Sequence, residues 1–182
     1  VTDARAVFQQ LAARSNIDDA KIGAWGMSMG GGTVLRSLVE GVPWAAVELT
    51  AVWTDLYSAL APQNLAKSGA IFQFLSSVPA NRLDPSVAAI RDDALASRNL
   101  SALRAWADAR SSRKLLSNVR TPLFFFQGRR DFAFDITQAK AGYALVKGPK
   151  RLYIGDFGHA PSTFPGPDFS HLATLGLQWF QR

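Results

Sequence analysis

A serine flanked by glycines, lying between a strand-like and a helix-like segment, constrains this chain more than any other feature. The sequence GMSMG at residues 26–30 follows a short apolar run at 21–25 and leads through further glycines into a helix-compatible run at 33–40. This order predicts a strand, a sharp turn with Ser28 at its apex, and a helix. Such a turn strains the serine backbone, so we expect Gly26 and Gly30 to relieve the crowding around it.

The turn would lift the hydroxyl of Ser28 clear of the backbone. A serine hydroxyl is a weak nucleophile by itself, and it needs a base on one side and a substrate carbonyl on the other. The pattern G-x-S-x-G between a strand and a helix is that of a nucleophile elbow. The alternative is a glycine-rich turn with an incidental serine, because so short a motif also arises by chance.

The composition is that of an ordinary globular chain and excludes several classes of function. Of the 182 residues, 48% are hydrophobic and 19% are charged, which is enough apolar material for a sizeable core. No run of about 18 apolar residues is present, so we expect no membrane span. The absence of cysteine excludes disulfides, thiolate metal ligands and a cysteine nucleophile. The net charge of +6 is scattered along the chain, so we expect no nucleic-acid partner.

Apolar segments of strand length alternate with amphipathic segments of helix length along most of the chain. Strands are expected at residues 21–25, 44–52, 121–127 and 150–155. Helices are expected at residues 1–14, 33–40, 135–146 and 168–180. The alternation predicts the α/β class, with a mainly parallel sheet flanked by helices.

The middle of the chain departs from this alternation. Between residues 55 and 118 strand signals vanish, and short helical patterns are broken by proline, glycine and asparagine. We therefore expect a core formed by residues 1–54 and 119–182, with a helical insertion at 55–118. The insertion is interpreted as a lid over Ser28; an ordinary helical subdomain is the compatible alternative.

A base for Ser28 must come from one of two histidines. His159 follows the last expected strand, and Ser28 also follows a strand. The carboxyl ends of parallel strands meet at one edge of a sheet, which is where sites form in open α/β folds. His171 falls inside the last expected helix and is interpreted as a surface or packing residue. His159 is therefore the expected base.

The acid that orients the base should also follow a strand. Asp131 fits, because it comes just after the strand expected at 121–127. Asp135 directly precedes a helix and competes as an N-cap, and Asp156 lies close in sequence to His159. The order Ser28, Asp131, His159 is that of the α/β-hydrolase fold.

With these residues in place, the chain resembles the α/β-hydrolase superfamily over nearly its whole length. Within it, the chain is most similar to the S15 peptidase and cocaine-esterase-like acyl esterases. The resemblance rests on residues 21–31, 52–57, 119–122, 126–131 and 158–159. It implies a serine hydrolase that cleaves an ester or a peptide bond of a small-molecule or peptide substrate through an acyl-enzyme, without a metal or other cofactor.

The resemblance also assigns roles to single residues. Ser28 would attack the carbonyl, His159 would act as base and then as acid, and Asp131 would hold the imidazole. The backbone N–H of Met29 would supply half of the oxyanion hole. Two alternatives stay open: a catalytically silent hydrolase-like domain used for binding or assembly, and an acyltransferase or thioesterase on the same fold.

One feature of the superfamily is missing from the sequence. The second oxyanion donor comes from a loop after an early strand, whereas this sequence starts one helix before the elbow. The strand at 21–25 would then form an apolar edge with unpaired backbone groups. We therefore expect an N-terminal segment of the same protein as a partner, with a homo-oligomer as the alternative.

Overall fold

The computed structural model describes residues 1–181, which form two compact units. Of the described residues, 1–54 and 112–181 form the first unit, and 55–111 form the second. The first unit contains the sheet and the second is helical. Among the described residues, no helix is both long enough and apolar enough to cross a bilayer.

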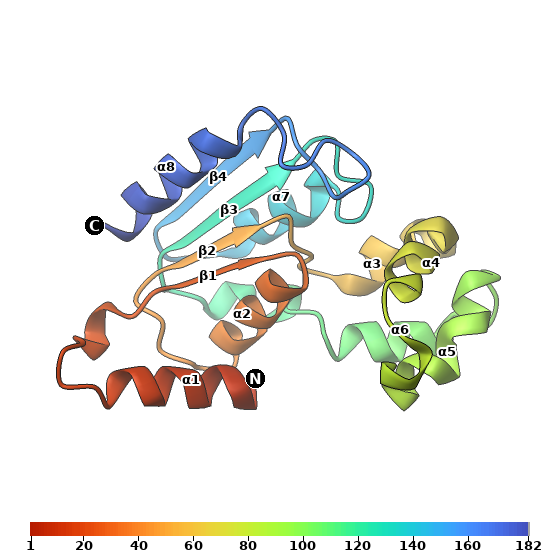
Figure 1. Cartoon of the computed structure of the whole chain (residues 1–182), viewed down its shortest axis with the longest axis horizontal. Helices are drawn as coiled ribbons and strands as arrows, with labels where there is room; N and C mark the ends of the chain where they lie inside the picture. The colour runs from red at the N-terminus through yellow and green to blue at the C-terminus, as the bar shows by residue number, and fades with distance from the viewer. Residues whose placement is uncertain (182) are drawn as a thin grey trace. The chain divides into compact units, whose positions relative to one another are not determined.

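Four parallel strands form the sheet of the first unit, in the order β1-β2-β3-β4 (Figure 1). Their bounds are β1 (Ala24–Met27), β2 (Val47–Thr50), β3 (Leu123–Gly128) and β4 (Lys150–Gly155). The expected parallel sheet is confirmed, and the last strand has the expected bounds. The first strand begins three residues later than expected, because Asp19–Lys21 forms a 3-10 turn whose Ala20 N–H is capped by Asp18.

Helices cover both faces of this sheet. They are α1 (Thr2–Ala12), α2 (Met29–Val39), α7 (Ile136–Leu145) and α8 (Phe169–Phe180). Side chains of α1, α2 and α7 share one apolar core with Leu123 and Phe125 of β3. On the other face, Phe124 packs against Trp179 of α8 with ring centroids 5.3 Å apart. Successive side chains of a strand point to opposite faces, and all six residues of β3 are buried between the two layers.

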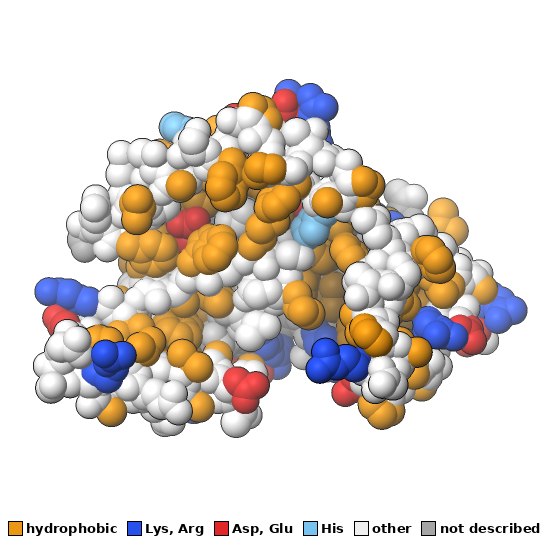
Figure 2. Space-filling view, in the orientation of Figure 1, with side chains coloured by type: hydrophobic (Ala, Val, Ile, Leu, Met, Phe, Trp, Pro, Cys, Tyr) orange, Lys and Arg blue, Asp and Glu red, His pale blue; other side chains and the backbone are white. Residues whose placement is uncertain are grey.

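The strand β1 lies at an open edge of the sheet. The N–H groups of Ala24 and Ser28 donate to the β2 side, to the carbonyls of Ala46 at 3.0 Å and Thr50 at 2.9 Å. The backbone groups of the alternate residues, Trp25 and Met27, therefore face the open edge. The Trp25 side chain is 59% exposed. Figure 2 shows hydrophobic side chains gathered on the visible side of the molecule, between α8 and α1.

The second unit is built from short helices. They are α3 (Leu56–Leu60), α4 (Ser68–Ser76), α5 (Pro85–Leu95) and α6 (Ser101–Asp108). Aspartates cap two of them: Asp55 accepts from the Ser58 N–H, and Asp84 accepts from the Ser86 N–H. Within the unit, α4 packs on α5, and α6 packs on both α3 and α5. The interpretation of this unit as a lid stays a prediction.

Candidate active site

Ser28 occupies the turn between β1 and α2 in a strained conformation. Its φ is 52° and its ψ is −122°, a backbone region that residues other than glycine rarely adopt. The helix starts at once, because the Gly32 N–H donates to the Ser28 carbonyl at 2.9 Å. The helix expected from residue 33 therefore begins four residues earlier, at Met29.

The tight turn requires glycine at two positions, of which the sequence identified one. A Cβ on Gly26 would lie 2.6 Å from the Gly30 carbonyl oxygen, and a Cβ on Gly31 would lie 2.8 Å from the Gly26 oxygen. The expectation for Gly26 is confirmed. The expectation for Gly30 was wrong, because a Cβ there would have no neighbour within 4 Å. Gly30 contributes its backbone to the close approach, and Gly31 is the second residue that has to lack a side chain.

The structure brings Ser28, His159 and Asp131 into one chain of hydrogen bonds. The Nε2 of His159 lies 2.7 Å from the Ser28 hydroxyl oxygen. The Nδ1 of His159 lies 2.9 Å from each carboxylate oxygen of Asp131. An ionised carboxylate only accepts hydrogen bonds, so Nδ1 donates and Nε2 is left to accept the serine proton. His159 and Asp131 are buried and Ser28 is half-buried.

The backbone after β3 holds the Asp131 carboxylate in place. The N–H groups of Ala133 and Phe134 each donate to Oδ1 at 2.9 Å. On the other oxygen, the side-chain amide of Gln127 donates to Oδ2 at 3.3 Å and also to the Phe134 carbonyl. These donors fix the carboxylate against the His159 ring.

Two glycines allow the loops after β3 and β4 to cross closely enough for this contact. A Cβ on Gly128 would lie 1.9 Å from the Phe157 carbonyl oxygen, and a Cβ on Gly158 would lie 2.4 Å from the Arg130 oxygen. The Arg130 N–H also donates to the Phe157 carbonyl at 3.1 Å. The crossing brings the loop of Asp131 beside the loop of His159.

The competing acids and the second histidine have other partners. Asp135 caps α7 by accepting from the Thr137 N–H at 2.8 Å. Asp156 accepts from Arg129 at 3.0 Å and also pairs with Arg130, and these hydrogen bonds lower the pKa of Asp156 to about 2. His171 lies on α8, with its ring centroid 5.5 Å from that of Tyr153.

An aromatic ring packs against the imidazole, and a second ring packs behind it. The Phe134 ring stands edge-on to His159, with centroids 5.2 Å apart and planes at 90°. Trp53 packs on Phe134 at 5.0 Å, and a Cβ on Gly32 would lie 2.2 Å from the Trp53 ring. The sequence reasoning missed Phe134 as a neighbour of the base and Gln127 as a neighbour of the acid. Their nearness in sequence to Asp131 was the available signal.

Met29 is the first residue of α2, directly after Ser28. The backbone N–H groups of a first helical turn have no acceptor within the helix, and they carry the positive end of the helix dipole. The Met29 N–H is one of these first-turn groups. The Met29 side chain is 75% exposed.

Comparisons with known proteins identify the fold. No model of a protein family matches this chain, and a search of curated proteins gave no match. Solved structures match almost all of it. The acetyl xylan esterase from Paenibacillus sp. R4 matches with a TM-score of 0.64 and 15% identity, over 96% of this chain and 50% of that chain. The acylaminoacyl peptidase of Pyrococcus horikoshii matches with a TM-score of 0.67 and 16% identity, over 97% of this chain and 26% of that chain.

A puromycin hydrolase matches with a TM-score of 0.61 and 22% identity, over 87% of this chain and 21% of that chain. The chain thus spans half or less of the length of each of these proteins. The chain has part of the α/β-hydrolase fold. This confirms the fold expected from the sequence.

Proposed function

We propose that this chain carries the catalytic centre of a serine hydrolase that cleaves a carboxylic ester or a peptide bond. The observation that carries the proposal is the continuous hydrogen-bond chain from the Ser28 hydroxyl through His159 to Asp131, with 2.7 Å and 2.9 Å links. A serine at a strained turn, bonded to a base that is itself held by an acid, is the arrangement that activates a hydroxyl nucleophile.

In the first step, the Ser28 oxygen attacks the substrate carbonyl carbon while its proton moves to the Nε2 of His159. The imidazolium that forms is stabilised by Asp131 through Nδ1. The tetrahedral intermediate collapses as its bond to the leaving alcohol or amine breaks, and His159 Nε2 gives that group the proton. The product of this step is an acyl-serine ester at Ser28.

In the second step, a water molecule attacks the acyl-serine carbonyl and His159 takes its proton. Collapse of the second tetrahedral intermediate breaks the bond to Ser28, releases the carboxylic acid and returns the proton to the serine oxygen. In both steps the Met29 N–H donates to the negative oxygen, which is a contribution of a few kcal/mol for a well-placed donor.

The open edge of β1 is the proposed attachment point for the rest of the site. Unpaired backbone groups on an apolar edge strand favour pairing with a further strand. We propose that another segment of the same protein pairs with Trp25 and Met27 there and supplies the second oxyanion donor. A second copy of the chain is the alternative occupant, and cross-linking mass spectrometry from Lys21 of the full protein separates the two.

Within the fold, our proposed subgroup is that of S15 peptidases and cocaine-esterase-like acyl esterases, supported by the stretches at 21–31 and 52–57. The helical unit is proposed as a lid. The Phe134 ring packs on His159 and the Trp53 ring packs on Phe134, and these rings support a substrate with an apolar acyl or leaving group.

The proposal is tested by turnover of a p-nitrophenyl ester by the complete protein. Ser28→Ala should abolish turnover, whereas Ser162→Ala should retain it. Ser162 belongs to the same loop as His159, but its hydroxyl is bonded to the Arg130 carbonyl at 2.9 Å. Equal activity of Ser28→Ala and the parent protein would exclude Ser28 as the nucleophile.

A further inference from the structure

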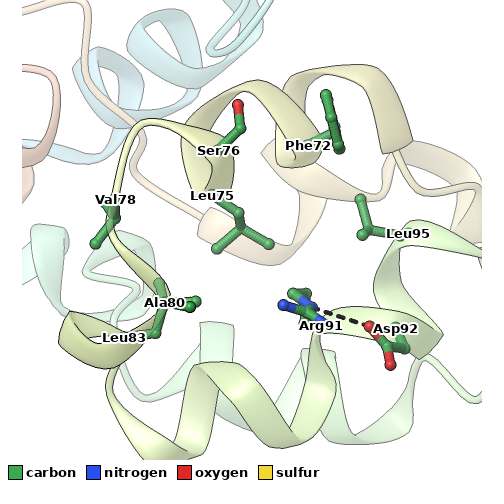
Figure 3. Close-up of a pocket in the computed structure, with 9 residues that line it drawn as sticks. All are labelled: Phe72, Leu75, Ser76, Val78, Ala80, Leu83, Arg91, Asp92 and Leu95. Atoms are coloured by element: carbon green, nitrogen blue, oxygen red, sulfur yellow. Dashed lines mark hydrogen bonds and ion pairs between the residues drawn. The ribbon is translucent and has the colours of Figure 1, made fainter.

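The helical unit contains a largely apolar cavity whose lining includes one arginine, Arg91, and one aspartate, Asp92. The cavity has a volume of about 340 Å³ and lies between α4, the 77–82 turn and α5 (Figure 3). Its apolar walls come from Phe72, Leu75, Val78, Ala80, Leu83 and Leu95, and its polar lining comes from Ser76 and the Arg91–Asp92 pair. A volume of this size falls in the range of small-molecule sites. All residues that line it belong to residues 55–111, so the site is contained in one unit.

The apolar wall is left uncovered within the unit. Phe72 is 62% exposed, and Val78 at the opposite side of the cavity is also exposed. An apolar ligand that covers these side chains removes their surface from water. This stabilises the bound state by about 25 cal/mol per Å² of apolar area removed from water. The wall therefore favours a ligand with a hydrocarbon chain or ring.

Arg91 selects the polar end of that ligand. Its Nε donates to the carboxylate of Asp92 at 2.9 Å, and both side chains are exposed, so the pair is weak. Figure 3 shows the Arg91 side chain at the floor of the cavity, with this bond on one side. The two Nη groups of the guanidinium lie outside the bond, and their planar geometry matches the two oxygens of a carboxylate.

We propose that this cavity binds a monocarboxylate with an apolar chain, such as a medium-chain fatty acid, with Arg91 holding the carboxylate. The hydrocarbon lies against Leu75 and Leu83, and the head group faces α5. The proposed binding site does not use Ser28, so binding of the carboxylate does not require hydrolysis.

The test is a titration of the full protein with sodium octanoate, followed by the methyl NMR signals of Leu75, Val78 and Leu83 and by calorimetry. Arg91→Gln should weaken octanoate binding at least about tenfold, which is about 1.4 kcal/mol, because it removes a hydrogen bond between charged groups. Arg98→Gln is the matched control. Arg98 is an exposed arginine that pairs with Asp93 outside the cavity lining, and its substitution should change binding less than twofold. Thermal unfolding of both variants verifies that they are folded.

The dependence on chain length tests the apolar wall without altering the protein. From butanoate to octanoate, affinity should rise about fourfold per methylene, as burial of about 0.8 kcal/mol per CH₂ requires. Octylammonium should bind more weakly than octanoate. The proposal is overturned if octanoate does not bind, if the perturbed methyl groups lie elsewhere, if acetate binds as well as octanoate, or if Arg91→Gln and Arg98→Gln have equal effects. Ser28→Ala should retain binding, which separates this result from that of the hydrolase proposal.

Discussion

The Nδ1 of His159 lies 2.9 Å from both carboxylate oxygens of Asp131, so the acid faces the base with both of its oxygens. The same Oδ1 accepts from two successive backbone N–H groups. The imidazole is therefore held by a carboxylate that is itself fixed by the loop after β3. In the proposed mechanism, this contact sets which ring nitrogen carries the proton.

Asp131→Asn should lower kcat for ester hydrolysis by about 10⁴-fold. The amide can donate to Nδ1, which places the proton on Nε2 and prevents that atom from accepting the Ser28 proton. The control is Asp135→Asn, because asparagine caps a helix about as well as aspartate. Stopped-flow or steady-state assays on both variants measure the effect. Retention of activity within tenfold in Asp131→Asn would contradict the role of the acid.

Gly26→Ala should destabilise the protein and lower activity, whereas Gly30→Ala should do neither. The new Cβ would lie 2.6 Å from backbone at residue 26 and would be unobstructed at residue 30. Overpacking against backbone costs about 1–3 kcal/mol, and alanine in place of an exposed helical glycine stabilises by up to about 1 kcal/mol. Urea unfolding measures both changes. Equal effects of the two substitutions would show that the elbow has a different packing.

The case of Gly30 shows where sequence reasoning reaches its limit. The order of strands and helices follows from local patterns, and parallel strands bring their carboxyl ends to one edge, so the approach of Ser28, Asp131 and His159 could be foreseen. The crossing of the loops at Gly128 and Gly158 depends on packing between distant segments, which spacing along the chain does not encode. Packing also decides which glycines of the elbow lie against neighbouring backbone, and spacing along the chain does not encode this either.

Gln127→Met should lower both stability and kcat. The Gln127 side chain is fully buried at the end of β3, and its amide donates to Asp131 and to the Phe134 carbonyl. Loss of these donors leaves buried acceptors less satisfied, which costs about 1–3 kcal/mol in unfolding free energy. Gln138 is also buried, but it bonds to Thr54. Gln138→Met should lower stability and leave kcat nearly unchanged. A kcat equal to that of the parent protein in Gln127→Met would argue against its positioning of Asp131.

Glu48 should make the protein less stable as pH rises. Its side chain is 6% exposed, and burial raises its pKa from 4.5 to about 7, against a smaller lowering by Trp25. Between these pH values the folded state holds a proton that the unfolded state has released. Stability therefore falls with increasing pH, by at most about 1.4 kcal/mol per pH unit.

Glu48→Gln should remove this contribution. The unfolding free energies of the variant and of the parent protein should therefore converge toward pH 4.5 and diverge up to pH 7. Urea unfolding at pH 5, 6, 7 and 8 measures the difference. Glu40→Gln, at an exposed helix end, leaves Glu48 in place and is the substitution control. Parallel pH profiles for Glu48→Gln and the parent protein would contradict a titrating, buried Glu48.

Covalent labelling tests most directly whether Ser28 is an activated nucleophile. The complete protein is treated with a fluorophosphonate probe and digested, and the modified residue is located by mass spectrometry. We predict one phosphonylated serine, Ser28, with labelling lost in Ser28→Ala and strongly slowed in His159→Gln. Absence of labelling at Ser28 in folded protein, or labelling that is unchanged in His159→Gln, would contradict the account.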